Sequence, residues 1–430
     1  MLLIYLKQAW QLLKQNRFYS TIYILATGLS ISLVMVLAIV LYLKVSNVYP
    51  ESDRDRILVV RYGEAVYPDG NRGVNRLSLE TVRQCIYSLQ TPEAVTAIYE
   101  AYGSVSVQPD DRAENESGTV KFVDTGFWKV FTFAFTEGQP FTQADMDAGI
   151  KTVVISESYA RKIFGTTQVT GKYIRIDFVP YRISGVVKDV SYAVDKTYAD
   201  MWMPYTAHPS LNVGWANGLG FFAAYVLAPH GETAKVEEEI RSNINRYAST
   251  FTENTFSVNG QPDPYWLSIF RLSNRQDVDA TRIVSTYLLI LLVLLLIPSV
   301  SLSGIADSQM ERRLAEMGVR RTFGALQGGL MKQLVLENML LTFLGGLTGL
   351  LFSYLLVYFF RRWIIHIGTG QVFVNAVPQG VDVALSPSML MNFSVFFVAL
   401  LLCLVLNLMV TLLPAWRASR RPIIYSLNNK

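Results

Sequence analysis

The stretch Asp307–Glu337, DSQMERRLAEMGVRRTFGALQGGLMKQLVLE, is a charged interlude between two long hydrophobic runs. The runs on either side, residues 283–306 and 338–360, contain no Asp, Glu, Lys or Arg. Each is long enough to cross about 30 Å of hydrocarbon, which takes about 20 helical residues. We therefore expect two membrane spans joined by a segment on one side of the membrane. A solvated connecting loop and a segment that binds a partner are both consistent with this pattern.

Two further uncharged runs, residues 18–43 and 383–416, give four candidate spans in 430 residues. The last run is longer than one span requires, so we place the start of its helix near residue 387. Hydrophobic residues make up 51% of the chain, which is high for a soluble enzyme, while 17% charged residues is high for a membrane bundle alone. These totals predict membrane helices together with a globular domain.

The globular domain is expected between the first and second spans. Residues 45–282 contain 23 Lys and Arg against 29 Asp and Glu, whereas the whole chain has a net charge of +4. Short segments rich in Lys and Arg stay on the cytoplasmic side of a membrane, while long domains cross it largely regardless of charge. We therefore expect both termini and the interlude to be cytoplasmic and the large domain to lie outside. The basic residues that support this orientation are Lys7, Lys14, Arg17, Arg312, Arg313, Arg320, Arg321, Lys332, Arg417, Arg420, Arg421 and Lys430. Arg361 and Arg362 oppose it, and we interpret them as interfacial residues that extend toward water.

Strand and helix patterns alternate through the large domain and predict an α+β fold. A strand over residues 152–156 followed by a helix over 157–164 is one example, and the segment YWLSIFRL, residues 265–272, is expected to be the closing strand. We expect two subdomains, with the middle one inserted into the other. The predicted boundaries are an interfacial helix 1–17, spans 18–44, 282–306, 338–362 and 387–416, the outer domain 45–281, the interlude 307–337, an outer loop 363–386 and a tail 417–430.

The sequence lacks the motifs of common hydrolases and metalloenzymes. The three histidines are far apart, and no HExxH or GxSxG motif occurs. The segment GTTQVTGK, residues 165–172, has five residues between its glycines where a phosphate loop has four, and Tyr173 stands where Ser or Thr would hold magnesium. We therefore expect no catalytic residue, no metal site and no nucleotide bound by this chain.

Three glycines mark a packing face in the third span. Gly345 and Gly349 are four residues apart, with Gly346 beside them. Small residues at this spacing let a second helix approach closely, and three glycines in five residues weaken a helix unless packing compensates. We assign this face to helix packing and to a contact between two copies of the chain.

The chain resembles the MacB/FtsX-like family of ABC transporter permeases over nearly its whole length, and three stretches carry the resemblance. The interlude follows the family pattern ER..EIG.RRA.GA, the tail PAWRASRRPIIYSL resembles the family's closing motif, and VVISESYARKIFG resembles part of the MacB-type periplasmic core. The resemblance implies that the interlude forms a helix that contacts an ATPase. The residues that we assign to this coupling are Glu311, Arg312, Glu316, Met317, Gly318, Arg320, Arg321 and Gly324.

The resemblance implies that this chain is a permease subunit of the bacterial inner membrane and that it pairs with a second copy or a paralogue. It would couple ATP hydrolysis by a dimer of cytoplasmic ABC ATPase subunits, encoded on another chain, to movement of its periplasmic domain. ATP and magnesium would bind that partner, so this chain itself would not be an enzyme. The family's tasks include export, efflux, lipoprotein handling and control of cell-wall hydrolases, with a periplasmic adaptor, lipoprotein or hydrolase as a further partner. Membrane lipids are expected contacts and nucleic acid is not.

A ligand-sensing transmembrane receptor without ATP coupling is the alternative from another class. Four spans and a large external domain fit both functions. The family pattern of the interlude favours the permease, because a receptor would normally carry a cytoplasmic output domain and the longest inner segment here is only the interlude.

Overall fold

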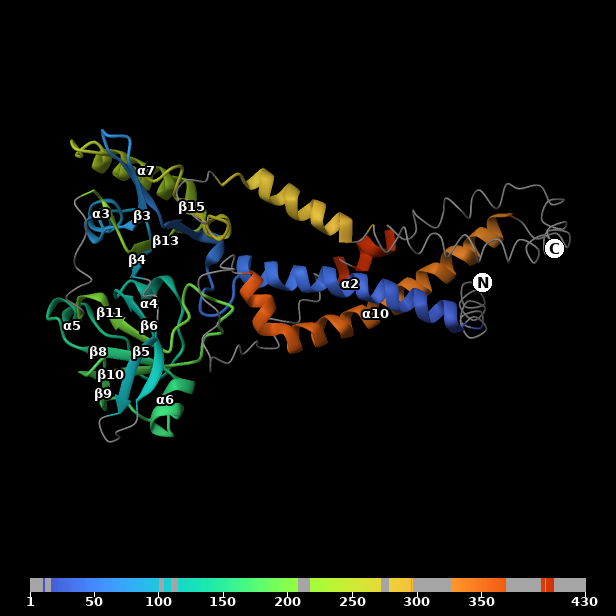
Figure 1. Cartoon of the computed structure of the whole chain (residues 1–430), viewed down its shortest axis with the longest axis horizontal. Coiled ribbons are helices and arrows are strands. Elements are labelled where there is room, and N and C mark those ends of the chain that lie inside the picture. The colour runs from blue at the N-terminus through green and yellow to red at the C-terminus, as the bar shows by residue number, and fades with distance from the viewer. Residues whose placement is uncertain are drawn as a thin grey trace. The chain divides into compact units, whose positions relative to one another are not determined.

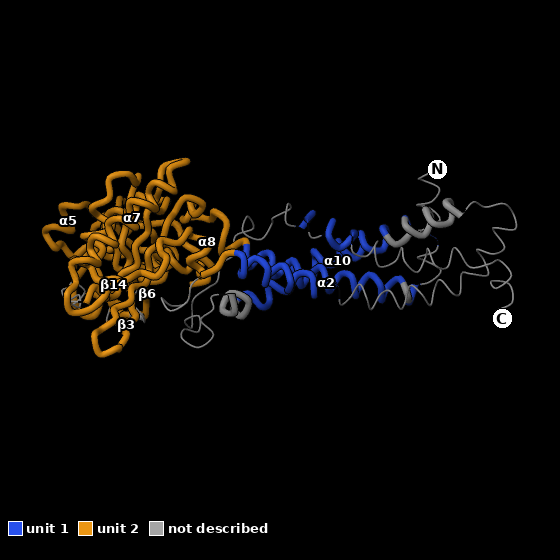
Figure 2. Tube along the Cα trace, turned by 90° about the horizontal axis from the view of Figure 1, so that it is seen from above, with its two compact units in different colours: residues 1–41, 281–369, 386–430 blue, residues 42–280, 370–385 orange. Residues whose placement is uncertain are grey.

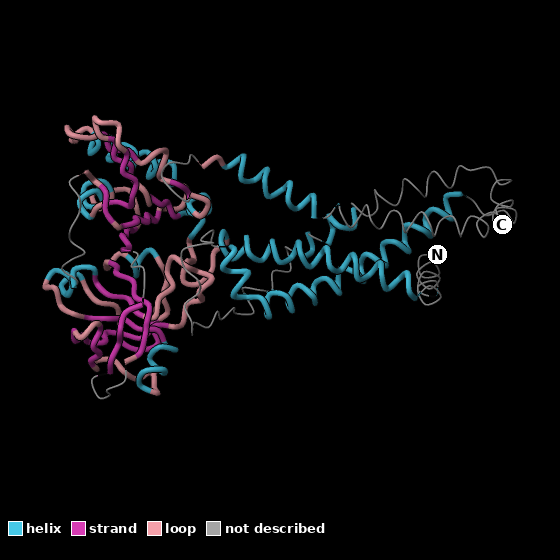
Figure 3. Tube along the Cα trace, in the orientation of Figure 1, coloured by secondary structure: helices cyan, strands magenta, loops and turns pink. Residues whose placement is uncertain are grey.

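The computed structural model describes residues 11, 17–99, 104–109, 115–207, 217–271, 278–294, 296, 327–368, 396–398 and 400–405. The predicted interfacial helix, the outer loop and the tail lie outside these residues, apart from residues 11, 17 and 363–368. The chain divides into two compact units (Figure 2). Unit 1 contains residues 1–41, 281–369 and 386–430, and unit 2 contains residues 42–280 and 370–385. Every described strand lies in unit 2 (Figure 3).

Two long helices dominate unit 1. Helix α2 (Arg17–Val45) begins in unit 1 and ends in unit 2, and α10 (Gln327–Gly368) follows the interlude (Figure 1). Within them, Ser20–Val45 and Met339–Arg361 are long and apolar enough to cross a membrane.

The second and fourth predicted spans are described only in shorter pieces. These are the apolar helices Ala280–Leu294 and Phe396–Val405. Neither described piece reaches the length of about 20 residues that a span needs. The count of four spans therefore stays a prediction.

Unit 2 combines strands and helices, in agreement with the predicted α+β fold. The elements before the inserted part are η1 (Arg54–Arg56), β1 (Ile57–Val60), β2 (Gly63–Val66), β3 (Arg72–Leu77), α3 (Leu79–Cys85) and β4 (Ala94–Tyr99). The inserted part contains β5 (Ser104–Pro109), β6 (Glu116–Val123), α4 (Phe127–Val130), β7 (Phe135–Gly138), α5 (Gln143–Asp147), β8 (Thr152–Ser156), α6 (Glu157–Phe164), β9 (Tyr173–Ile176), β10 (Val179–Val187) and β11 (Met201–Pro204). The elements that follow are η2 (Tyr205–Ala207), β12 (Leu219–Gly220), β13 (Phe222–Leu227), α7 (Thr233–Ala248), β14 (Thr255–Ser257), β15 (Asp263–Pro264) and α8 (Tyr265–Ser268).

The inserted part forms a closed ring of six strands. Its order is β11, β8, β10, β9, β5, β6, and β6 pairs with β11 to close the ring. The pairs β8–β10 and β6–β11 are parallel and the other four are antiparallel. Strand β9 alternates as expected for a strand of a closed ring, with Ile174 and Ile176 buried and Tyr173 and Arg175 exposed. Strands β8 and β11 are instead buried along their whole length.

The strands before and after the insertion pair with one another. Strand β13 lies between β4 and β1, with all six of its residues in register with β4. Strand β1 also pairs with β15, where Val59 is opposite Asp263. The first and last strands of unit 2 therefore share one sheet, which brings the chain's entry into this unit close to its exit.

Local signals explain why some predictions match closely. Helix α6 covers residues 157–164 as predicted, because Ser156 caps its first turn by accepting a hydrogen bond from Tyr159 N, and Gly165 ends it with a left-handed φ of +73°. The predicted closing strand over residues 265–272 is wrong. Those residues start with the short helix α8, which Pro264 directly precedes, and a proline with its fixed φ suits a helix start.

Candidate functional site

The predicted ATPase-coupling residues lie outside the described residues. Residues 301–326 are not among them, and this range contains the whole set from Glu311 to Gly324. Their role therefore stays a prediction. The structure describes helix α10, which follows them in the sequence, and the contacts that α2 makes in each unit.

The glycine face of α10 packs against α2 of the same chain. A methyl group on Gly345 would lie 2.8 Å from Thr27 Cβ, and one on Gly349 would lie 2.7 Å from the carbonyl oxygen of Gly28. Neither position has room for a side chain, so the two backbones approach closely here. A contact between two copies of the chain through the same face would have to displace α2, and this contact stays a prediction.

The matching half of the contact is Gly28, which sequence reasoning did not single out. A methyl group on Gly28 would lie 2.6 Å from Thr348 Oγ1 and 3.2 Å from the carbonyl oxygen of Gly345. The signal was present in the sequence ATGLSIS, residues 26–32, where Gly28 and Ser32 repeat the small-residue spacing.

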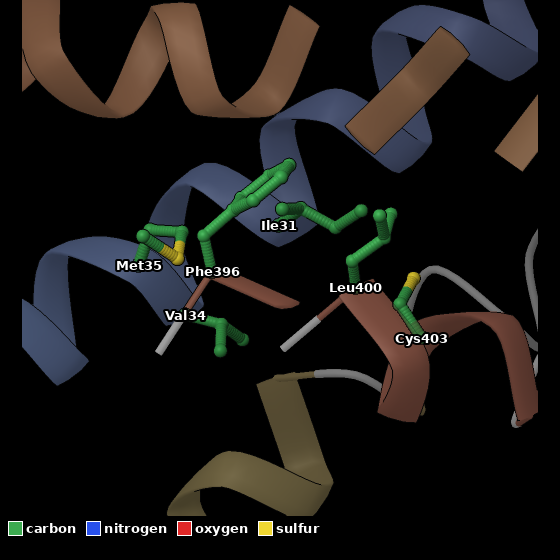
Figure 4. Packing of buried hydrophobic residues seen from close by; sticks show 6 residues of the cluster. All are labelled: Ile31, Val34, Met35, Phe396, Leu400 and Cys403. Atoms are coloured by element: carbon green, nitrogen blue, oxygen red, sulfur yellow. The ribbon is translucent and has the colours of Figure 1, made fainter. Parts of the chain in front are cut away.

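Gly346 faces a different neighbour. A methyl group on it would clash with Leu400, which belongs to the helix Phe396–Val405. Leu400 is part of a buried cluster in unit 1 that joins this helix to α2 (Figure 4). The members of the cluster are Ile31, Val34, Met35, Phe396, Leu400 and Cys403.

The end of α2 is held in unit 2 by a buried arginine. Arg54 is 3% exposed, and its Nη1 donates to the carbonyl oxygens of Leu43 and Ser46 at 2.7 Å each. The last carbonyl groups of a helix have no partner within the helix and carry partial negative charge. A guanidinium group is suited to this position, because it supplies several donors and a positive charge together.

Glu51 neutralises Arg54 and connects it to two other segments. Its Oε2 accepts from Arg54 Nε at 2.8 Å and also from the Tyr265 hydroxyl, and its Oε1 accepts from Thr197 Oγ1 at 2.9 Å. Glu51 is fully buried, with 0% of its surface exposed. The Arg54 guanidinium carbon lies 5.0 Å from the centre of the Tyr265 ring, at a distance typical of a cation–π contact. One carboxylate therefore joins the residues after α2, the segment before β11 and helix α8.

The surroundings keep the Arg54 guanidinium charged and the Tyr265 phenol protonated. Burial alone would lower the pKa of Arg54, but the adjacent Glu51 carboxylate raises it above its usual value. Burial raises the pKa of Tyr265 well above that of a free phenol, and the Glu51 carboxylate raises it further. The guanidinium stays positive and the phenol keeps its proton, so each can donate to Glu51.

A second buried ion pair lies on the chain's way out of unit 2. Arg271 Nε donates to Asp263 Oδ2 at 2.5 Å, and Arg271 Nη2 donates to Oδ1 at 2.9 Å. The side chains are 3% and 4% exposed. Asp263 lies in β15, whose neighbour β1 begins three residues after Arg54. The segment that leads out of unit 2 is thereby held to the sheet that contains β1, the first strand after α2.

We call Glu51, Arg54, Tyr265, Asp263 and Arg271 the junction. The sequence did not identify it, because Glu51 and Tyr265 are 214 positions apart and their contact depends on the paired strands β1 and β15. The available signal was the charged run ESDRDR, residues 51–56, directly after the first span.

Comparisons with known proteins match both halves of the chain. The MacB-like periplasmic core domain matches residues 20–243, and the FtsX-like permease C-terminal domain matches residues 288–423. The first match includes α2, Glu51 and Arg54, and the second includes α10 and its glycines.

Two curated relatives and one solved structure are similar to the chain. It is 25% identical over 257 residues to the uncharacterized ABC transporter permease YknZ of Bacillus subtilis, a match that covers 58% of this chain and 60% of YknZ. It is 23% identical over 274 residues to the macrolide export ATP-binding/permease protein MacB of Chromobacterium violaceum, covering 64% of this chain and 39% of that protein. The crystal structure of the YknZ extracellular domain from Gram-positive bacteria has 18% identity and a TM-score of 0.32, and covers 46% of this chain and 99% of that domain.

The matches to curated relatives thus span less than two thirds of each relative's length. The first family match alone covers more than half of this chain, and the second adds most of the remainder. The resemblance first seen in the interlude, the tail and the core segment is confirmed, and the chain belongs to the family of ABC transporter permeases with a MacB-like periplasmic core domain and an FtsX-like permease domain.

Proposed function

We propose that this chain is a transport subunit that converts ATP hydrolysis by a separate cytoplasmic ATPase into movement of its extracytoplasmic domain. The observation that carries the proposal is the junction. It ties the end of α2 to the segment that leads out of unit 2 through buried, charged side chains. A movement of α2 along or about its axis would therefore pull on both ends of the domain.

Buried charge pairs suit such a role because they resist partial loosening. Removing one partner of a buried pair leaves an uncompensated charge and costs about 3–5 kcal/mol. A joint of this kind moves as a whole instead of stretching gradually. The exposed ion pairs elsewhere in unit 2, such as Arg161 with Glu157, contribute little by comparison.

The proposal places the ATPase on the interlude, at the residues from Glu311 to Gly324. Helix α10 begins directly after this segment and runs into the glycine contact with α2. A push on the interlude would reach α2 through the contact of Gly345 and Gly349 with Thr27 and Gly28. ATP and magnesium would bind the partner, both termini would be cytoplasmic and unit 2 would face the periplasm.

Co-purification with the separate ABC ATPase that we propose as the partner tests the proposed coupling. We expect the wild-type chain to retain the ATPase in detergent and Met317→Asp and Gly318→Trp to release it. Arg161→Gln, which changes an exposed residue of unit 2, is the matched control and should retain it. Undiminished complex and transport in both interlude variants would exclude this coupling segment.

The proposal also distinguishes the permease from a receptor that works without ATP. In membrane nanodiscs, the wild-type complex should hydrolyse ATP at a rate that depends on the chain. If the chain binds no ABC ATPase and leaves the ATPase rate of the neighbouring subunit unchanged, the receptor function is supported instead.

A further inference from the structure

The turn between β9 and β10 presents an aromatic residue to solvent. The turn consists of Asp177 and Phe178, with φ of +48° and +67°, between the paired residues Ile176 and Val179. Two left-handed residues in a two-residue hairpin form a type I′ turn, for which Asn-Gly is preferred. Phe178 is 79% exposed. A bulky side chain in this conformation is an outlier, and burial in the core of unit 2 does not account for it.

The turn is held firmly in place. Asp177 N donates to the carbonyl oxygen of Ser106 at 2.9 Å, and Ser106 N donates to Asp177 Oδ1 at 3.0 Å. Ser106 lies in β5, the neighbour of β9 in the closed ring. Phe178 is thus presented by a fixed strand pair, and little conformational entropy would be lost if it were bound.

Two other exposed apolar side chains belong to this hairpin or to the strand next to it. In the described part of unit 2, five large hydrophobic residues are well exposed: Val45, Ile150, Tyr173, Phe178 and Phe221. Tyr173 is on β9 of the same hairpin, and Ile150 lies two residues before β8, which pairs with β10. Three of the five therefore belong to one region of the ring, and we call Ile150, Tyr173 and Phe178 the apolar patch.

Among the described residues, the strands that carry the apolar patch also carry cations. Lys151, Lys172, Arg175 and Arg182 are exposed on the same strands or next to them. Arg182 pairs with Tyr173 across the hairpin, and its N donates to the carbonyl oxygen of Lys151 at 2.9 Å. The one acid of the turn, Asp177, is engaged by Ser106 N. Residues 45–282 as a whole carry more Asp and Glu than Lys and Arg, so these four cations stand out against the average charge of the domain.

We propose that the apolar patch is a docking surface for a protein partner that offers an apolar pocket for Phe178 with carboxylates around it. Phe178 is the aromatic anchor, and its exposed surface would become buried in the partner's pocket. The four cations favour an acidic rim on the partner and disfavour a basic one. The proposal goes beyond ATP coupling and does not depend on it, because it concerns the outer surface of the closed ring alone.

Photo-crosslinking in cells tests this docking surface. The photoreactive amino acid p-benzoylphenylalanine replaces Tyr173 in the full chain, and in a second strain it replaces Phe221, an exposed aromatic residue outside the patch. The probe at position 173 should give one protein adduct, mapped by mass spectrometry to a segment with Asp or Glu beside the linked residue. The probe at position 221 should not give that adduct.

Two variants make the test specific. Asp177→Asn with Phe178→Gly creates the preferred type I′ turn and removes the anchor, and Arg182→Glu reverses one charge of the rim. Each should reduce the adduct about tenfold or more, as expected for the loss of an anchor residue or a charge pair. The Asn-Gly variant should melt no lower than the wild type, which separates lost docking from lost folding.

Several results would overturn the proposal. An adduct that survives both variants would show that neither the anchor nor the charges are needed. A partner segment without acidic residues would contradict the charge argument. Lipid adducts alone would indicate a membrane contact, and adducts with a second copy of this chain alone would indicate self-association.

Discussion

Helix α2 is held in two different ways, one in each unit. In unit 1 its contact with α10 depends on shape, because Gly28, Gly345 and Gly349 leave no room for side chains. In unit 2 its end depends on charge, because Arg54 donates to the carbonyl oxygens of Leu43 and Ser46 and is neutralised by Glu51. The same helix therefore meets a contact without formal charge in one unit and a buried ionic contact in the other.

The difference follows from the surroundings that each contact has. Lipid chains are as apolar as leucine, so close packing of small residues is an effective way for helices to associate there. A water-exposed domain can bury a charge only if each charged group is paired and hydrogen-bonded. The first contact is expected to tolerate small displacements along the helix, whereas the second is either made completely or lost.

The largest effect is expected from Arg54→Ala. This substitution removes the donor for two helix-end carbonyl groups and leaves the Glu51 charge without its cation, at a cost of about 3–5 kcal/mol. Urea unfolding of the solubilised chain, followed by tryptophan fluorescence, to which Trp128, Trp202 and Trp266 of unit 2 contribute, measures it. Adding Glu51→Gln should recover part of the loss. An Arg54→Ala variant as stable as the wild type would contradict the claim that the buried ionic contact holds the end of α2.

A smaller effect is expected from Tyr265→Phe. The ring and its contact with Arg54 remain, while the hydrogen bond to the Glu51 carboxylate is lost, which costs about 1.5–3 kcal/mol. The same unfolding experiment measures this loss. A loss equal to that of Arg54→Ala would mean that the phenol, and not the guanidinium, is the principal partner of Glu51.

The packing contact is tested by Gly349→Ala. The added methyl group would lie 2.7 Å from the carbonyl oxygen of Gly28, and such overpacking typically costs about 1–3 kcal/mol. The loss of folded protein on heating in detergent, detected by size-exclusion chromatography, measures the effect. Leu351→Phe, at a position of α10 that is 62% exposed, is the control and should melt with the wild type. A Gly349→Ala variant that melts with the wild type would show that the contact between α2 and α10 can accommodate a methyl group.

The smallest effect is expected from Arg161→Gln. The pair of Arg161 with Glu157 joins side chains that are 59% and 20% exposed, and such pairs contribute about 1 kcal/mol or less. Urea unfolding under the conditions used for Arg54→Ala measures it. A loss comparable to that of Arg54→Ala would mean that burial is not what distinguishes the junction from other ion pairs.

The sequence predicted features whose signals are local. Helix α6 was placed correctly because its capping serine and terminal glycine both lie within one residue of its ends. The glycine face of α10 was recognised because its residues are four apart in one helix. Its partner on α2 was missed, although Gly28 and Ser32 carry the same spacing, because a face alone does not say which helix covers it.

Features that depend on distant pairing could not be predicted in this way. The predicted closing strand over residues 265–272 followed the β-propensity of Tyr265 and Trp266, but Tyr265 is needed on α8 to reach Glu51. No periodic pattern relates positions 51 and 265. The closed ring is likewise set by the pairing of β6 with β11, strands that begin 85 residues apart.

The most direct test of the central claim is a distance measurement between the two units during ATP turnover. Cys85 and Cys403 are both buried, so dyes attached to Lys129→Cys in unit 2 and Tyr358→Cys on α10 report selectively. With the partner ATPase in nanodiscs, we predict that energy transfer between the dyes changes on addition of ATP in the wild type. In Arg54→Ala the change should be lost while ATP hydrolysis continues. An equal change in Arg54→Ala, or none in an actively hydrolysing wild type, would contradict transmission through the junction.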